Sequence, residues 1–479
     1  MAAIPEKHLN LANERFEQYL GLQQRGFICQ ENDFLPAVHY PAITMYPPAS
    51  ADTIIDSTYH PPADGRYVIY VHLPFCIKCC TFCHYPNIYG YNSEAEKDRY
   101  LDALRIEMDL WREKLGVSKI PARSVLIGGG TPTFLTPKQL ERFLKDFTEC
   151  FDLSTNRQFN YDVDPVTLLG ETGRERLDLL QAYGVDRLTI GVQAMDADIL
   201  KRMNRHHTAE QSREAIEICK ARGIQLDIEY IFGYPGQTLE LWYDEVVKAC
   251  GLGTEEIQFY RLKIIPYGDR VGTITRKVSH HDEELVGIRD TIMMKSMAGT
   301  VCADYGYHEH LLRRVVAREK RFYSRYAYDQ CCNLVDTIGL GLTAFCSLND
   351  RHALNTQSFE EYYRMIGNRQ IPINRGLVRS KDQQMRWNTI LPLKNHFIRK
   401  QDFLRNTGVE FDSVFHEKRQ ALREAGLIEE TGEKVELTSV GKFFADEVAH
   451  QFYHGDFMPF PRTSYVAGDL NPYNNNHAL

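Results

Sequence analysis

The feature that most constrains the fold is a regular alternation of short β-rich segments with amphipathic segments between residues 67 and 265. Strands that alternate with helices of about 12–20 residues are typical of βαβ units, which build a parallel sheet. The pattern predicts a closed or an open, partial barrel, with its chemistry at the carboxyl ends of the strands. The predicted strands are residues 67–75, 124–130, 159–165, 187–193, 224–233 and 255–265.

Four units are predicted along the chain. We expect an N-terminal arm without clear periodicity, an α/β barrel, an accessory extension of the barrel, and a C-terminal α+β unit that resembles a winged helix. For the last unit a lid or packing role is favoured over DNA binding, because the net charge is −8. Its tail, rich in Tyr, Phe and Pro, is expected either to cover an aromatic or apolar substrate or to be a disordered end. The boundaries are 1–65, 66–270, 271–378 and 379–479.

Composition excludes several classes of protein. The chain is 43% hydrophobic and 25% charged, as is usual for a soluble globular protein. Its apolar runs are far shorter than the ~20 residues that span a bilayer, and its first residues lack the features of a signal peptide. We therefore expect a cytoplasmic protein that binds neither membranes nor nucleic acid.

A tight group of cysteines, CIKCCTFC at residues 76–83, indicates a metal site. One possibility is a zinc site with four thiolate ligands, although adjacent Cys79 and Cys80 cannot easily point at one ion. The other is a [4Fe–4S] cluster held by Cys76, Cys80 and Cys83, which leaves one iron open to a small molecule. In that case Cys79 is a surplus thiol. The position of the loop directly after a strand favours the iron–sulfur cluster.

The spacing C-x3-C-x2-C, with Phe82 before the last cysteine, resembles the signature of the radical S-adenosylmethionine (SAM) enzymes. The preceding segment YVIYVHLPFC further resembles the oxygen-independent coproporphyrinogen III oxidase branch of that family. The resemblance implies a partial (β/α)6 barrel and a [4Fe–4S] cluster whose open iron chelates SAM. It also implies a reducing partner such as flavodoxin or ferredoxin, and Phe82 is expected to pack against a flat base.

Other segments match residues that contact SAM in this family. The glycine turn of IGGGTPTFL lets the backbone approach a ligand closely and resembles the family's GGGTPT segment, which grips the methionine part of SAM. Asp162 stands where the family has Glu, and Glu229 where it has Asp; for each polar residue, a buried and paired side chain is the alternative. The segment IGLGLTAF resembles a G-x-G-x-x-(A/S) motif near a second ligand. The predicted cofactor contacts are Phe82, Gly128, Gly129, Gly130, Thr131, Asp162, Gln193, Arg205, Glu229, Gly339, Gly341, Thr343 and Ala344.

The branch of the family is predicted from two departures. The coproporphyrinogen enzymes carry a further cysteine where this chain has Tyr85, and the region before Gly339 lacks the H-N-x-x-Y-W signature of the heme chaperones. Both departures favour a third group, which uses two SAM molecules for methylation or cyclopropanation at an sp2 carbon. We therefore expect an aromatic or unsaturated small-molecule substrate.

In the implied mechanism, a 5′-deoxyadenosyl radical takes hydrogen from the methyl group of a second SAM, and the resulting methylene radical adds to the substrate. Tyr70, His72 and Lys263 lie at strand ends and are candidates for catalytic residues. The alternatives are an oxygen-independent coproporphyrinogen III dehydrogenase, a heme-degrading methylase, a heme-binding chaperone and a winged-helix redox-sensing regulator.

Overall fold

The computed structural model describes residues 3–31, 35–85, 93–265, 271–309, 315–395 and 397–479. The predicted barrel boundary at residue 270 lies outside these residues. No helix in the described part of the chain is long and apolar enough to cross a bilayer.

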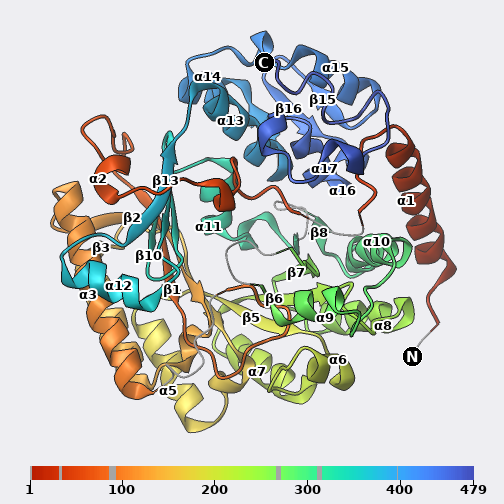
Figure 1. The fold of residues 1–479 in the computed structure, drawn as a ribbon. Helices are drawn as coiled ribbons and strands as arrows, with labels where there is room; N and C mark the ends of the chain where they lie inside the picture. The colour runs from red at the N-terminus through yellow and green to blue at the C-terminus, as the bar shows by residue number, and fades with distance from the viewer. Residues whose placement is uncertain (1–2, 32–34, 86–92, 266–270, 310–314, 396) are drawn as a thin grey trace.

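The predicted barrel strands form one parallel run in chain order (Figure 1). Among the described strands, the sheet extends from β13 (Ile373–Val378) at one edge to β8 (His308–Glu309) at the other, so the barrel is open. The α/β fold with a partial barrel is therefore confirmed. The parallel strands are β1 (Tyr67–Leu73), β2 (Ile120–Gly129), β4 (Phe159–Val163), β5 (Arg187–Gln193), β6 (Gln225–Phe232) and β7 (Glu256–Arg261).

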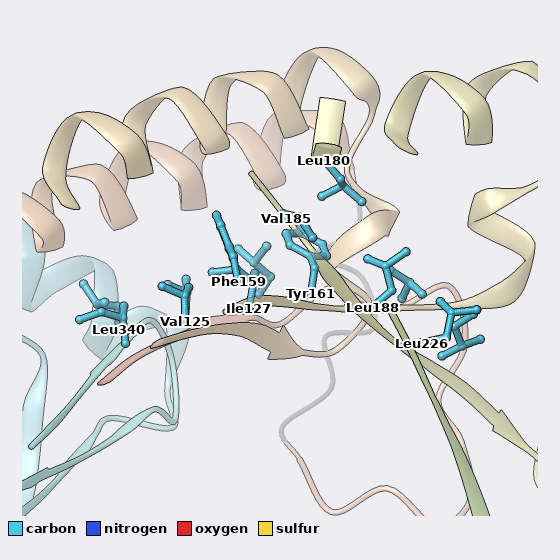
Figure 2. Close-up of a cluster of buried hydrophobic side chains, with 14 of the residues drawn as sticks. Val125, Ile127, Phe159, Tyr161, Leu180, Val185, Leu188, Leu226 and Leu340 are labelled. Carbon is cyan, nitrogen blue, oxygen red and sulfur yellow. The ribbon is translucent and has the colours of Figure 1, made fainter. Parts of the chain in front are cut away.

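Helices follow the strands as predicted and cover the outer face of the sheet. Ser93 is the N-cap of the first one, because its side chain accepts a hydrogen bond from the backbone N–H of Glu96. Figure 2 shows apolar side chains such as Phe159 and Leu188 gathered between the strands and these helices. The helices are α3 (Glu94–Leu115), α4 (Pro137–Cys150), α5 (Gly170–Ala182), α7 (Ala209–Ala221) and α8 (Leu239–Gly251).

The alternation of side chains along each strand separates this core from the barrel interior. In β4, Phe159 and Tyr161 face the helices and are fully buried, whereas Asn160 and Asp162 line a central cavity. In β5, Arg187, Thr189 and Gln193 likewise line the cavity. Polar residues of the strands therefore collect inside the barrel.

The accessory extension supplies a parallel strand that the sequence did not predict. β10 (Thr337–Leu340) pairs in parallel with β1, and three antiparallel strands continue the sheet from it. Gly339 permits this arrangement, since a Cβ there would lie 2.2 Å from the carbonyl oxygen of Phe345. The antiparallel strands are β11 (Phe345–Leu348), β12 (Arg351–Asn355) and β13.

The C-terminal unit lies above the barrel, and the first helix of the chain runs along one side of the molecule (Figure 1). The predicted arm begins with a helix, α1 (Glu6–Gln24), which packs against α10 (Ile288–Asp304). Side chains of α1 such as Tyr19 also share an apolar core with the C-terminal unit. That unit contains a three-stranded antiparallel sheet of winged-helix type. Its elements include α13 (Lys381–Asn395), β14 (Phe397–Arg399), α15 (His416–Glu424), β15 (Ile428–Glu430), β16 (Lys434–Leu437), α16 (Ser439–Phe443) and α17 (Ala445–His450).

In the part of the chain that the structure describes, the C-terminal tail, expected over residues 441–479 to cover a substrate, lines the cavity only through residues 443–447. As far as the described residues define the cavity, Glu447 is the last residue of the chain that lines it. The rest of the tail packs away from the cavity. Leu470 is buried in the core that α1 shares with the C-terminal unit, and Asp469 forms an ion pair with Arg25. The tail therefore joins the two chain ends to each other.

A buried carboxylate in α3 holds the turn that follows β10. Glu107 is fully buried, and its Oε2 accepts hydrogen bonds from the backbone N–H of Gly341 at 2.9 Å and from the hydroxyl of Tyr362 at 2.7 Å. Its Oε1 accepts a third from the side-chain amide of Asn355 at 2.9 Å. Burial raises the pKa of Glu107 to about 7, against the lowering effect of these donors.

Replacing Glu107 by Gln should flatten the pH dependence of thermal stability. The folded protein keeps a proton on Glu107 that the unfolded chain releases near pH 4.5. The stability linked to this proton is present below about pH 4.5 and is lost as the pH rises through 7, at about 1.4 kcal/mol per pH unit. Glutamine has no such proton to lose. The melting temperature of Glu107→Gln should therefore fall less between about pH 5 and 8 than that of the wild type.

The control for this prediction is Glu113→Gln, which changes a carboxylate on the same helix that is 60% exposed. Melting curves followed by tryptophan fluorescence would give the comparison. If the melting temperatures of the wild type and Glu107→Gln changed equally with pH, the assignment of a proton to Glu107 would be contradicted.

Candidate active site

A cavity of about 1120 Å³ lies at the carboxyl ends of the barrel strands. Its walls come from the barrel, from α10, from the N-terminal arm and from α16 and α17 of the C-terminal unit. This volume exceeds the roughly 300–1,000 Å³ that is usual for one small-molecule ligand. The cavity can therefore hold a cofactor together with a substrate.

The cysteine loop, residues 76–83, forms one wall of the cavity. Cys76, Cys80 and Cys83 line the cavity together with Phe82, whereas Cys79 is not among its lining residues as the described chain defines them. The thiol of Cys79 instead lies 3.6 Å from the carbonyl oxygen of Cys80. The structure thus separates the three predicted ligands from the surplus thiol.

Neighbouring elements fix the backbone of this loop. The hydroxyl of Thr81 lies 2.6 Å from that of Tyr234, and the backbone N–H of Thr81 donates to the carbonyl of Met203. The side-chain amide of Asn204 donates to the carbonyl of Cys79 at 2.7 Å. Asn204 has a positive φ of 58°, a conformation that Asn tolerates better than most residues. The loop is therefore anchored before any ligand binds.

The glycine turn at the end of β2 touches a different neighbour at each position. A Cβ on Gly128 would lie 2.5 Å from Oδ2 of Asp162, and one on Gly129 would lie 2.9 Å from the ring of His72. A Cβ on Gly130 would lie 2.6 Å from the carbonyl oxygen of Phe75 and 2.9 Å from Sγ of Cys76. Gly129, Gly130 and Thr131 line the cavity, whereas Gly128 lies behind them. Packing alone therefore requires glycine at these three positions.

Arg205 links the cysteine loop to the barrel. Its Nη1 donates to Sγ of Cys80 at 3.1 Å, and its Nη2 donates to Oδ2 of Asp164 and to the carbonyl of Gly191. His206 Nε2 lies 3.0 Å from the other oxygen of Asp164. Neighbouring cations and hydrogen bonds hold the pKa of Asp164 below its usual value despite burial. Asp164 is therefore a charged anchor for the arginine.

Sequence reasoning missed Asp164 and His206. A signal was present, because Asp164 is the N-cap of a short helix directly after β4 and its side chain accepts the N–H of Val166. A capping role and an ion pair at the same residue cannot be separated from sequence alone.

Deeper in the barrel lies a layer of ionisable groups that sequence reasoning also missed. Arg187 is 1% exposed, and its Nη2 lies 3.2 Å from Asp227 Oδ2 and 2.7 Å from Glu256 Oε1.

Burial, followed by repulsion from Glu229, raises the pKa of Asp162 well above its usual value. Asp162 thus faces the cavity in surroundings that disfavour its ionised form.

The remaining predicted contacts of the barrel also reach the cavity. Gln193 ends β5 with a positive φ of 69°, at a register shift between β5 and β6. Such a conformation costs energy for a non-glycine residue and is enriched at functional sites. Glu229 accepts a hydrogen bond from the hydroxyl of Tyr260 at 3.0 Å. Both side chains line the cavity beside Asp162.

The three candidate catalytic residues all line the cavity. The hydroxyl of Tyr70 and Nδ1 of His72 lie 3.0 Å apart. Burial lowers the pKa of His72 to about 3, so its ring is neutral at physiological pH. Lys263 follows β7 and is 9% exposed. A neutral imidazole and a phenol can donate or accept a hydrogen bond here, and Lys263 can contribute a positive charge.

Only part of the predicted second-ligand segment reaches the cavity. Thr343 lines it with a φ of 65°, and its Oγ1 is buried without a hydrogen-bond partner among the described residues. Gly341 has a φ of 91°, and a Cβ there would lie 2.5 Å from both the carbonyl of His72 and the hydroxyl of Tyr100. Gly339, Gly341 and Ala344 are therefore placed as packing residues behind Thr343.

The arrangement of donors fits an iron–sulfur cluster better than a zinc ion. Three thiols share the cavity wall, and Arg205 Nη1 already donates to one of them. Nε of Arg205 is buried and has no hydrogen-bond partner in the described part of the chain. In the same residues, no set of three or more His, Cys, Asp or Glu side chains converges on one ion position, as a zinc site requires.

Comparison with known proteins agrees with this geometry. The family model of the Radical SAM superfamily matches residues 70–244. The oxygen-independent coproporphyrinogen III oxidase of Pseudomonas aeruginosa is 26% identical over 80% of this chain and 85% of its own length. The heme chaperone HemW of Bacillus subtilis is also 26% identical, over 80% of this chain and 98% of its own length.

A solved structure extends the likeness to the fold. The coproporphyrinogen III oxidase HemN of Escherichia coli superposes with a TM-score of 0.68 over 80% of this chain and 89% of that protein, at 22% sequence identity. The matched domain contains the cysteine loop, the glycine turn and Arg205. Residues 70–244 therefore match a Radical SAM domain, the chain has the fold of HemN, and a [4Fe–4S] cluster and SAM are its cofactors.

Proposed function

We propose that the protein catalyses the oxygen-independent oxidative decarboxylation of a propionate-bearing tetrapyrrole, and that coproporphyrinogen III is the first substrate to test. The observation that carries the proposal is a set of cationic side chains in the same cavity as the cysteine loop. Arg261 and Lys263 at the end of β7 and Lys295 of α10 all line the cavity. Carboxylates of a substrate are the natural partners of such cations.

Similar proteins also support this choice. Oxygen-independent coproporphyrinogen III oxidases match most of the chain, and HemN has the same fold. The sequence-based preference for methylation or cyclopropanation receives no such support from these relatives. The size of the cavity is compatible with SAM and a tetrapyrrole together.

When bound, the iron–sulfur cluster and SAM supply a 5′-deoxyadenosyl radical that can abstract a hydrogen atom. The residues of the chain prepare the site for this chemistry. Arg205 places positive charge beside Sγ of Cys80, and neutral His72 and Tyr70 line the wall without adding charge. Arg261 and Lys263 would orient a propionate, and the enclosing units would exclude water from the radical.

Methyl-derived carbon transfer with a second SAM is the competing function. Tyr85 favours it, because it occupies the position at which the coproporphyrinogen enzymes carry a further cysteine. In the structure Tyr85 lines the cavity, with its ring centroid 5.7 Å from that of His72. An aromatic side chain at this point would narrow the space beside the cysteine loop.

One experiment separates the two functions. Protein reconstituted anaerobically with iron and sulfide is given dithionite, SAM with a deuterated methyl group, and coproporphyrinogen III. We expect unlabelled 5′-deoxyadenosine, formed faster with the substrate than without it, and a product that has lost carbon dioxide from propionate. Both are measured by mass spectrometry.

Deuterium in the 5′-deoxyadenosine would instead show that the methyl group of a second SAM is attacked, and carbon transfer would replace our proposal. Absence of substrate-dependent 5′-deoxyadenosine, together with a Soret shift when heme is added, would indicate a heme-binding protein similar to HemW.

Cys79 should be dispensable for the iron–sulfur cluster. Because its thiol lies against the carbonyl of Cys80, outside the cavity wall, Cys79→Ala should retain the full iron content after reconstitution. Cys80→Ala should lose most of it, since a ligand is removed. Iron and sulfide analysis of both variants makes the comparison, and equal losses would contradict this assignment of ligands.

Replacing Arg205 by Met should shift the reduction potential of the iron–sulfur cluster to more negative values. Net charge and hydrogen bonds to the sulfurs set such potentials, and Arg205 contributes both at Cys80. Redox titration followed by electron paramagnetic resonance would measure the shift. Arg202→Met is the matched control, because Arg202 is 50% exposed and forms an ion pair with Glu283 at the surface. The same shift in both variants would contradict a specific effect of Arg205.

A further inference from the structure

The N-terminal arm enters the cavity at a point fixed by a buried ion pair. Lys394 of α13 and Asp446 of α17 lie 2.7 Å apart, and their side chains are 7% and 13% exposed. The backbone N–H of Ala37 donates to Asp446 at 2.8 Å, and Lys394 donates to the carbonyl of Ala37 at 3.0 Å. Both backbone groups of one residue are thus held by the C-terminal unit.

This attachment places His39, two residues further along the arm, in the cavity wall. Its ring packs edge-on against Phe345, with centroids 4.5 Å apart. Nδ1 is buried and has no hydrogen-bond partner among the described residues. His39 as a residue is partly accessible and lines the cavity, so we infer that Nε2 is the nitrogen that it offers to a ligand.

The surroundings of His39 determine its charge. Burial, together with the positive charges of Lys394 and Lys263, lowers the pKa of His39 to about 3. The imidazole is therefore neutral at physiological pH and can donate one N–H. Lys263 shares the cavity wall with His39, and its positive charge acts on the imidazole.

We propose that His39 and Lys263 together bind a carboxylate of the substrate, the imidazole through an N–H donor and the lysine through its charge. This inference rests on the proposed function and names the residues that recognise the propionate. It makes the N-terminal arm part of the substrate site. A neutral donor beside a cation suits a carboxylate, because the anion gains a second hydrogen bond without a second charge to desolvate.

A purely structural role for His39 would tolerate different substitutions from a role in substrate binding. Packing against Phe345 needs only a flat ring, which Phe would supply, whereas substrate binding needs a polar group, which Gln would supply. His39→Phe and His39→Gln therefore separate the two roles. His60→Phe is the control, because His60 lies exposed on the same arm.

The first test needs no substrate. Diethylpyrocarbonate is added anaerobically to the reconstituted protein, and modified histidines are located by peptide mass spectrometry. We expect His39 to react faster than His352, a nearby histidine that is 1% exposed and whose ring centroid lies 6.2 Å away. Equal or slower modification of His39 would overturn the proposal, whatever the substrate is.

The second test uses coproporphyrin III, the stable oxidised form of the expected substrate. Its binding to the reconstituted protein is titrated through the Soret band. We expect the dissociation constant to rise about 10- to 100-fold in His39→Phe, since a hydrogen bond to a charged group is lost. In His39→Gln it should rise no more than about threefold, and the porphyrin should protect His39 of the wild type from modification. Melting temperatures confirm that each variant folds.

Unchanged binding by His39→Phe would overturn the inference and leave the proposed function intact. The reverse order of the variants, with Phe tolerated and Gln not, would assign His39 to packing alone. A wild type that is labelled at His39 but binds no coproporphyrin III would overturn the tetrapyrrole substrate, and the proposed function would fail with it.

Discussion

The close approach of the glycine turn to the strand that precedes the cysteine loop is the constraint on which the site depends. A side chain on Gly130 would collide with the carbonyl of Phe75 and with Sγ of Cys76, and one on Gly129 would collide with His72. Because neither clash occurs, the loop lies directly over the end of β2, where the backbone N–H of Thr131 donates to the carbonyl of Phe75 at 2.6 Å. Every other group of the site is placed relative to this contact.

Sequence reasoning predicted the barrel well, because period-two strands and capped amphipathic helices carry strong local signals. It also found the cysteine loop and glycine turn, whose spacing is itself the signal. It could not find pairings between distant segments: Arg187 with Asp227 and Glu256 joins three strands. It also missed β10, since a short Gly-rich segment has no clear period. Sequence reasoning also missed the part of the cavity wall that contains His39 and Lys394. These two residues are 355 positions apart along the chain and meet only after folding.

Electrostatics divide the cavity into two parts. Toward the barrel, burial and Glu229 disfavour the ionised form of Asp162, and Arg187 is paired with Asp227 and Glu256. Toward α10 and the C-terminal unit, the cations Arg261, Lys263 and Lys295 line the cavity together with the carboxylates of Asp446 and Glu447. A site that excludes water protects a radical, whereas cationic side chains can orient an anion. In the proposed function the two parts therefore have separate tasks, one for the cofactors and one for the substrate.

This division explains why the ends of the chain matter to chemistry that the barrel supports. Helix α1 reaches α16 through a hydrogen bond of 2.9 Å from Arg15 to Ser439, and both residues line the cavity. The arm is tied to α13 and α17 through Ala37. The substrate region is thus enclosed by segments that meet only when arm, barrel and C-terminal unit are all folded. Changes in these segments can alter the substrate while the glycine turn and the cysteine loop keep the cofactor chemistry unchanged.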